Sequence, residues 1–127
     1  MARHRELWVR RYAGAVGISF LLAAVVGFLI EERGFGVLNS DLAEDLLHTL
    51  TAALLIYVGF VERRGEVVRR VVAGQGIVYV LIGLLGFAAP MLFGLLPSGY
   101  SALDNAIHLV EGVVSVGIVW LLPPARL

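Results

Sequence analysis

The sequence predicts an all-α membrane protein with four transmembrane helices in a single domain, residues 1–127. Of its 127 residues 59% are hydrophobic, and the mean hydropathy is +0.88, whereas a soluble domain is roughly half apolar. Residues 12–30 and 71–89 are uncharged runs of 19 residues each. At 1.5 Å per residue, such a helix crosses a hydrocarbon core about 30 Å thick. Two further apolar stretches carry only a few polar side chains each, which gives four spans.

The first predicted span, Tyr12–Ile30, follows a basic segment and precedes Glu31. A cleaved signal peptide would have a shorter apolar run and small residues at its end, so we expect a retained span. The second span covers about 42–61. Asp41 and Glu44 stand three positions apart at its start, as in a capping box.

Residues Glu62–Arg70 are predicted to form a charged turn before the third span, Val71–Ala89. The fourth span covers about 102–122. Ser101, with a carboxylate three residues later, repeats the capping pattern at its start, and Pro123 begins a Pro-Pro pair that ends it.

The arginines predict the orientation. All ten basic residues are arginine, and nine lie in the N-terminus, the loop between the second and third spans, or the C-terminus; Arg33 is the exception. By the positive-inside rule both termini are cytoplasmic. Aromatic residues are expected to anchor the two interfaces, three at the cytoplasmic side and one at the other: Trp8, Tyr12, Trp120, and Tyr100.

The two halves of the chain repeat, the first from about 12–61 and the second from about 71–122. The offset between matching positions stays between 58 and 60 residues. Matching pairs are Gly17 and Gly76, Gly27 and Gly86, Glu44 and Asp104, Asp45 and Asn105, and His48 and His108. Because each half crosses the membrane twice, the repeats are parallel tandem hairpins with a pseudo-two-fold axis along the membrane normal.

Three phrases resemble a known family: the FGVLNS of the first outer loop, GIVYVLIGLLGF in the third span and LDNAIHLVEG at the start of the fourth. The family comprises small bacterial membrane proteins and is classified only as a domain of unknown function. It has Asn-x-x-His at the head of its second and fourth helices. Here Asp45 replaces that asparagine in the first half, and Ala52 replaces the usual glycine. The resemblance implies a bacterial inner-membrane protein and no particular activity.

Glu111 is the most informative polar residue. It shares one helical face with Asp104, His108 and Ser115, and it lies about 13 Å into the fourth span at 1.5 Å per residue. An ionisable group near the midplane costs roughly 3 kcal/mol unless it is neutral, paired or hydrated. One interpretation is a hydrogen bond to a neighbouring helix, through Gln75, Tyr79 or Thr51. The other is a carboxylate that binds a proton or a ligand, with His108 one turn away.

His48 and His108 are predicted to face each other at one depth. They are candidate axial ligands of a haem, or, with Glu111, ligands of a divalent metal. Alternatively, each imidazole forms hydrogen bonds that hold the two halves together. Glu44 and Asp104 are expected chiefly to cap their helices, although their carboxylates also favour a cation at that end of the protein.

The leading functional hypothesis is a structural or accessory membrane protein, a homo-oligomer or a subunit of a larger complex, in contact with the lipid bilayer. The alternatives are a haem- or metal-binding protein and a proton-coupled transporter or channel around Glu111. The absence of cysteine excludes disulfides and thiolate chemistry. The sequence contains no motif of a known enzyme class and no nucleic-acid-binding patch, so neither an enzyme nor a nucleic-acid partner is expected.

Overall fold

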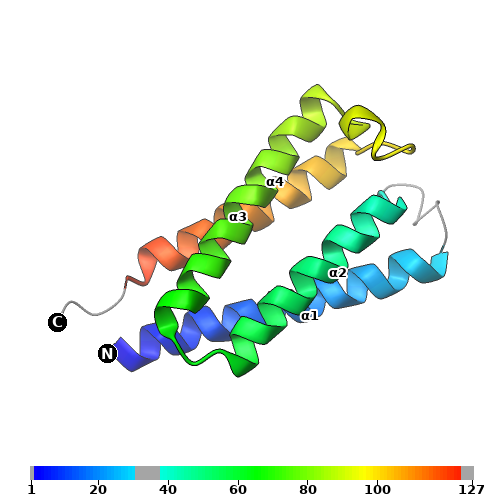
Figure 1. Cartoon of the computed structure of the whole chain (residues 1–127). Coiled ribbons are helices and arrows are strands. Elements are labelled where there is room, and N and C mark those ends of the chain that lie inside the picture. The colour runs from blue at the N-terminus through cyan, green and yellow to red at the C-terminus, as the bar shows by residue number, and fades with distance from the viewer. Residues whose placement is uncertain (1, 31–37, 124–127) are drawn as a thin grey trace.

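The computed structural model describes residues 2–30 and 38–123, which form helices joined by short loops and contain no strand (Figure 1). Its elements are α1 (Ala2–Ile30), α2 (Leu42–Ile56) with the π-helical continuation η2 (Tyr57–Val61), α3 (Gly65–Ala88), the 3-10 turn η3 (Leu92–Gly94) and α4 (Ala102–Leu121). Within these two ranges, four helices are long and apolar enough to cross a membrane. The predicted all-α class and the four membrane-span-like helices are therefore confirmed.

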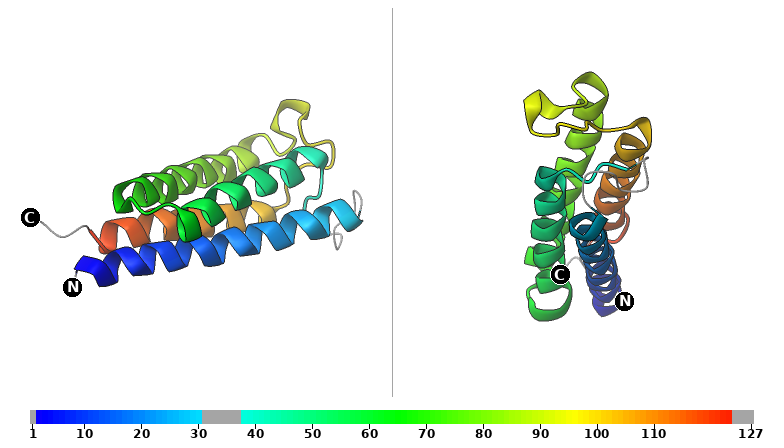
Figure 2. Two further views of the ribbon diagram at one scale, coloured as in Figure 1. Left: turned by 60° about the horizontal axis from the view of Figure 1, so that its bottom comes forward. Right: turned by 90° about the vertical axis from the view of Figure 1, so that its right-hand side faces the viewer.

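The helices form two hairpins, α1 with α2 and α3 with α4, whose members pack closely along their lengths. Figures 1 and 2 show the hairpins side by side, with the start of α1 and the end of α4 at the same end of the bundle. The backbones of the two hairpins approach chiefly through α3, which packs on both α1 and α2, whereas few backbone positions of α1 and α4 come close. This uneven packing leaves space on the α1–α4 side of the bundle.

Two helices begin before the predicted spans, and the predicted turn Glu62–Arg70 is wrong over most of its length. Helix α1 begins at Ala2, so the basic N-terminal segment is helical, and α3 begins at Gly65, so most of the predicted charged turn is also helix. The remaining turn is fixed by Glu62, whose Oε1 accepts hydrogen bonds from the backbone N–H and Nε of Arg64 at 2.9 and 3.0 Å. These bonds from Arg64 lower the pKa of Glu62 to about 2. The turn is therefore shorter than predicted, and α3 already begins at Gly65.

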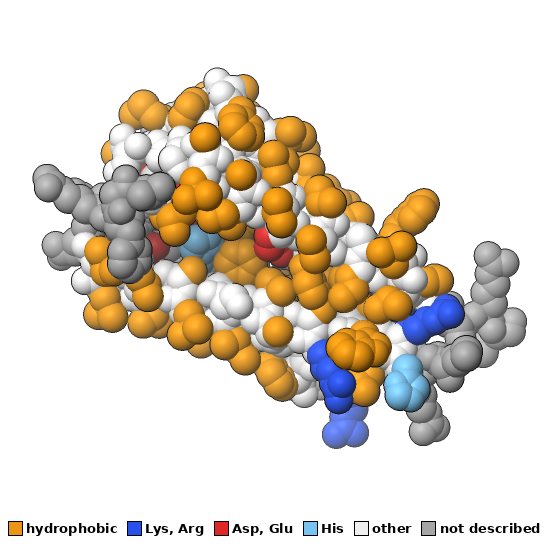
Figure 3. Space-filling model, turned by 180° about the vertical axis from the view of Figure 1, so that it is seen from behind, with side chains coloured by type: hydrophobic (Ala, Val, Ile, Leu, Met, Phe, Trp, Pro, Cys, Tyr) orange, Lys and Arg blue, Asp and Glu red, His pale blue; other side chains and the backbone are white. Residues whose placement is uncertain are grey.

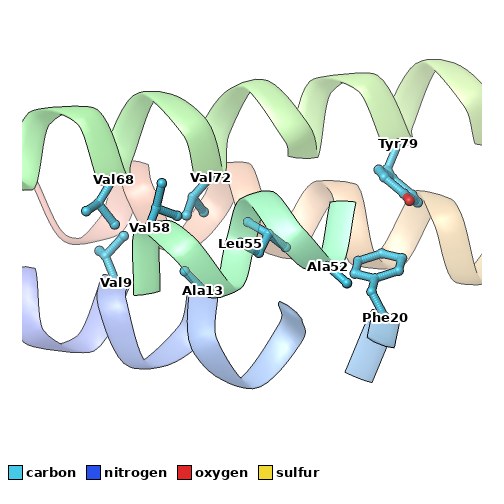
Figure 4. Packing of buried hydrophobic residues seen from close by; sticks show 9 residues of the cluster. All are labelled: Val9, Ala13, Phe20, Ala52, Leu55, Val58, Val68, Val72 and Tyr79. Atoms are coloured by element: carbon cyan, nitrogen blue, oxygen red, sulfur yellow. The ribbon is translucent and has the colours of Figure 1, made fainter. Parts of the chain in front are cut away.

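The apolar core lies between the hairpins (Figure 4). It combines small residues with a few large ones: Val9, Ala13, Phe20, Ala52, Leu55, Val58, Val68, Val72 and Tyr79. Most large apolar side chains instead point outward, for example Leu22, Leu50 and Val110, each more than 60% exposed. Figure 3 shows apolar side chains over most of one face. Such an apolar exterior is what helices surrounded by lipid require.

Two glycines allow the helices of each hairpin to approach at the end where α2 and α4 begin. A Cβ on Gly27 of α1 would overlap the carboxylate of Asp45, and a Cβ on Gly86 of α3 would overlap the side-chain amide of Asn105. Both pairs were predicted to be equivalent, and both make the same kind of contact. The repeat boundaries and the pseudo-two-fold axis themselves stay predictions.

Candidate functional site

Glu44, in the first turn of α2, is the centre of a buried polar cluster and is only 2% exposed. Its Oε1 lies 2.9 Å from Nε2 of His48 and 3.0 Å from Nε2 of His108. Its Oε2 accepts a hydrogen bond from the hydroxyl of Tyr100. One carboxylate therefore binds three donors, from α2, from α4 and from the loop before α4. We call Glu44, His48 and His108 the Glu44 cluster.

Local helix geometry and packing between hairpins assemble this cluster. His48 follows Glu44 by four residues, so the two side chains share a helix face. His108 comes from α4, 64 positions further along the chain than Glu44. Its ring centroid is 4.9 Å from that of Tyr100 and 5.4 Å from that of Tyr79, both edge to face. These contacts hold a His108 side chain whose Nδ1 is buried without a hydrogen-bond partner among the described residues.

The predicted capping role of Glu44 is wrong. In the described part of the chain, no side chain caps the start of α2. Asp41 instead accepts bonds from the backbone N–H and hydroxyl of Ser98, at 2.9 and 2.8 Å, and from Nδ2 of Asn39 at 2.8 Å. Burial acts to raise the pKa of Asp41, but these hydrogen bonds outweigh it, and the pKa lies below its ordinary value. Asp41 thus ties the two hairpins together, and Glu44 points inward.

The predicted capping role of Asp104 is confirmed. The hydroxyl of Ser101 accepts from the backbone N–H of Asp104 at 3.1 Å, and the Asp104 carboxylate accepts from the Ser101 N–H at 2.8 Å. Asp104 also accepts from the backbone N–H of Asn39 at 3.0 Å. Its carboxylate therefore binds backbone N–H groups at the start of α4 and before α2, and it takes no part in the Glu44 cluster.

Glu111 belongs to a second polar cluster, nearer the middle of the bundle. Nε2 of Gln75 lies 2.7 Å from both of its carboxylate oxygens, and the hydroxyl of Ser115 donates to Oε1 at 2.7 Å. Ser115 is in turn 2.7 Å from the hydroxyl of Tyr12. Of the partners predicted for Glu111, Gln75 is therefore correct. The other two pair with each other, since the hydroxyls of Thr51 and Tyr79 are 2.9 Å apart.

Tyr100 belongs to the candidate site, although the sequence did not predict it there. It was predicted to anchor the membrane interface, but it is only 6% exposed and its hydroxyl bonds to Glu44. Burial and the Glu44 carboxylate raise the pKa of Tyr100, so the phenol keeps its proton and acts as the donor. Its position directly before the cap residue of α4, where a loop returns over the bundle, is a signal that could have indicated this role.

A cavity of about 360 Å³ opens beside both clusters, between α1, α2 and α4. Its α1 wall is largely apolar, including Val16, Phe20, Ala23 and Val26. Its opposite wall carries the Glu44 cluster and the carboxylates of Asp45, Asp104 and Glu111. Figure 3 shows this face hollowed, with a histidine and acidic side chains visible inside. The site residues predicted from the sequence thus share one cavity, although only three of them are in mutual contact.

The Glu44 cluster has the donor atoms of a metal site. One ligand atom from each of its three residues lies within 4.8 Å of the others. Two imidazoles and a carboxylate suit zinc and other divalent transition metals, and three protein ligands leave a position for a further ligand. Axial haem ligation does not fit, because axial imidazoles lie on opposite faces of the macrocycle. Here both Nε2 atoms point at one carboxylate oxygen, and the ring centroids are 6.2 Å apart.

Together these features define a small helical protein with four membrane-span-like helices and a buried polar site. Residues 1–61 match the model of a family described as Domain of unknown function (DUF4383). The resemblance inferred from the sequence is confirmed over these residues, which include Glu44 and His48. No curated protein and no solved structure matches the chain.

Proposed function

We propose that this protein is an integral membrane protein that binds one divalent transition-metal ion at Glu44, His48 and His108. The observation that carries the proposal is that both imidazole Nε2 atoms converge on one buried carboxylate oxygen. For each Nε2 to ligate a cation, its proton would move to Nδ1 of a neutral ring or leave an imidazolium ring, and the Glu44 carboxylate would bind as it stands. Such a cation also offsets the buried negative charge of Glu44, which favours binding.

The surroundings of the cluster support this role. Tyr100 donates to Oε2 of Glu44, so the carboxylate is oriented while Oε1 stays directed at the histidines. Hydrogen bonds of this kind to ligating side chains strengthen metal sites. The same three residues line the cavity, which would supply water or another small ligand to complete the coordination.

The proposed topology has both termini in the cytoplasm of a bacterium and the Glu44 cluster in the outer half of the inner membrane. It is supported by the basic side chains near the start of α1 and around the turn before α3, among them Arg10, Arg63 and Arg64. The mouth of the cavity would then lie within the bilayer, between α1 and α4. Accessibility of single cysteines to a membrane-impermeant thiol reagent, introduced at Gly65 and Ser98, tests the topology. Labelling from the outside at Gly65 would contradict it.

Zinc binding tests the proposed function. Chelator-treated protein in lipid nanodiscs is dialysed against Zn²⁺, and elemental analysis gives the zinc per chain. We expect one ion per chain, with affinity at least about 100-fold weaker in Glu44→Gln and His108→Ala. His4→Ala is the matched control, because His4 is exposed, lies far from Glu44 in the sequence and is not one of the three proposed ligands. Equal binding by wild type and the two cluster variants, or no binding by wild type, would contradict the proposal.

A second role, as an oligomer or a subunit of a larger complex, is favoured by the loop before α4. Phe93 and Leu95 are 86% and 67% exposed there, outside the four spans. Phe93 also has a positive φ of 58°, which non-glycine residues rarely adopt. Crosslinking in native membranes through a photoreactive residue at position 93 tests this role. Products containing only lipid would contradict it.

A further inference from the structure

The charges around the cavity are one-sided. Among the described residues, no arginine lines it. Four carboxylates do: Glu44, Asp45, Asp104 and Glu111. Two imidazoles bind Glu44, and backbone N–H groups bind Asp104. The hydrogen bonds to Glu111 come from the neutral side chains of Gln75 and Ser115. In the part of the chain that the structure describes, Glu111 thus has neutral side chains as partners and no cation in an ion pair, and Asp45 and Asp104 likewise form no ion pair.

Gln75 holds the Glu111 carboxylate in place, although it is not itself among the residues that line the cavity. Its side chain is only 7% exposed, and its Nε2 is committed to the Glu111 carboxylate. Its Oε1 is buried without a hydrogen-bond partner among the described residues. A buried acceptor left unpaired costs about 1–3 kcal/mol. Of these two side chains only Glu111 lines the cavity, so its carboxylate is the group that would stabilise a positive charge or an N–H donor there.

The opposite wall suits hydrocarbon. Val16, Ala23 and Val26 of α1 present apolar side chains to the cavity, and Phe20 presents an aromatic ring. A volume of about 360 Å³ lies in the range of small-molecule sites. The cavity is bounded by α1 and α4, whose backbones come close at few positions. A ligand dissolved in the lipid has a sideways route to it.

We propose that this cavity binds a lipid-soluble organic cation, with the positive charge beside Glu111 and the hydrocarbon part against α1. The excess of carboxylates disfavours an organic anion, and the apolar wall and lateral opening favour a ligand with a hydrocarbon part. Phe20 offers an aromatic surface to a quaternary cation, as in other sites for such groups. The inference goes beyond the metal site, because Glu111 is not one of the three metal ligands. It also gives the predicted transport alternative a class of substrate.

Tetraphenylphosphonium is the probe, and tetraphenylborate, of the same shape and opposite charge, is its control. Binding of each to metal-free protein in nanodiscs is measured by equilibrium dialysis, with empty nanodiscs as baseline. We expect saturable binding of the phosphonium by wild type and no saturable binding of the borate. Glu111→Gln should weaken phosphonium binding by about tenfold or more, the equivalent of 1.4 kcal/mol.

Two more variants complete the test. Ala23→Phe fills the cavity from α1 without changing its charge, and it should also abolish saturable binding. Glu66→Gln removes an exposed carboxylate on α3, outside the cavity, and should bind as wild type does. Saturable binding of the borate, unchanged binding by Glu111→Gln, or no saturable phosphonium binding by wild type would each overturn the inference. Zinc stoichiometry should stay unchanged in Glu111→Gln, so failure here is distinguishable from failure of the metal site.

Discussion

The starts of α2 and α4 each have an acidic residue four positions before a histidine, Glu44 before His48 and Asp104 before His108. The two carboxylates nevertheless have different hydrogen-bond partners. Asp104 forms a capping box with Ser101 and stays at the helix end. Glu44 has no such cap partner, because Asp41 is engaged with Ser98 across the hairpin boundary. With one more methylene than aspartate, the Glu44 side chain reaches both histidines.

This difference makes one site out of two similar helix starts. If both acids capped their helices, His48 and His108 would lack the carboxylate that joins them. If both pointed inward, two buried negative charges would share two imidazoles. This arrangement is unfavourable, because a buried charge without its own partner is costly. One inward glutamate with two histidines is the balanced arrangement, and it joins the hairpins at the buried end of the cavity.

Side-chain length gives the strongest test of this comparison. Glu44→Asp keeps the charge but shortens the side chain to that of Asp104, so the carboxylate can no longer contact both Nε2 atoms. We expect zinc affinity to fall about 100-fold or more, as measured by calorimetric titration of protein in nanodiscs. Asp104→Glu is the control, and it should bind zinc as tightly as wild type. If Glu44→Asp kept wild-type affinity, the extra methylene would not explain the site.

The contacts of Gly27 and Gly86 test whether the helices of the two hairpins pack in the same way. Gly27→Ala and Gly86→Ala each place a Cβ on a polar side chain of the partner helix. Overpacking of this kind costs about 2–3 kcal/mol, and we expect similar losses of unfolding free energy in both variants. Gly74→Ala, where a Cβ meets nothing within 4 Å, should be neutral or stabilising. Unfolding by denaturant in mixed micelles measures all three. A loss confined to one hairpin would count against equivalent packing.

The all-α class and the four membrane-span-like helices could be predicted from the sequence, because the length and apolar composition of each span are properties of the chain itself. The inward turn of Glu44 could not, since it depends on Asp41 contacting Ser98, 57 positions away. Tyr100 was misplaced for a similar reason. A tyrosine next to a span suits a membrane interface, and only the packed loop shows that its hydroxyl is buried on Glu44. For Glu111 the sequence indicated a hydrogen bond to a neighbouring helix, and Gln75 was one of the three partners it offered.

Asp41 tests the other side of the comparison, the loss of the cap. Asp41→Asn should lower the unfolding free energy by about 2 kcal/mol, because hydrogen bonds to a charged acceptor are lost. Ser101→Ala should cost about 1 kcal/mol, the usual value of an N-cap. The pKa of Asp41 is lowered in the folded state, so its contribution is present above the ordinary aspartate pKa and decreases as the pH falls below it. Thermal unfolding between pH 3 and 7 should therefore show a weaker acid dependence in Asp41→Asn than in wild type. An unchanged acid dependence would contradict this role.

Tyr100 joins the two helix starts, since it directly precedes the cap of α4 and donates to the glutamate of α2. Tyr100→Phe keeps the ring that packs against His108 but removes the donor to Oε2. The carboxylate keeps its charge and its histidines, so zinc should still bind at one ion per chain, with affinity reduced about tenfold, as for other partners of metal ligands. Tyr57→Phe, at an exposed tyrosine, is the control. Zinc titration separates the outcomes: no change in Tyr100→Phe would mean that α2 alone orients Glu44, and complete loss would mean that the loop before α4 supplies a ligand.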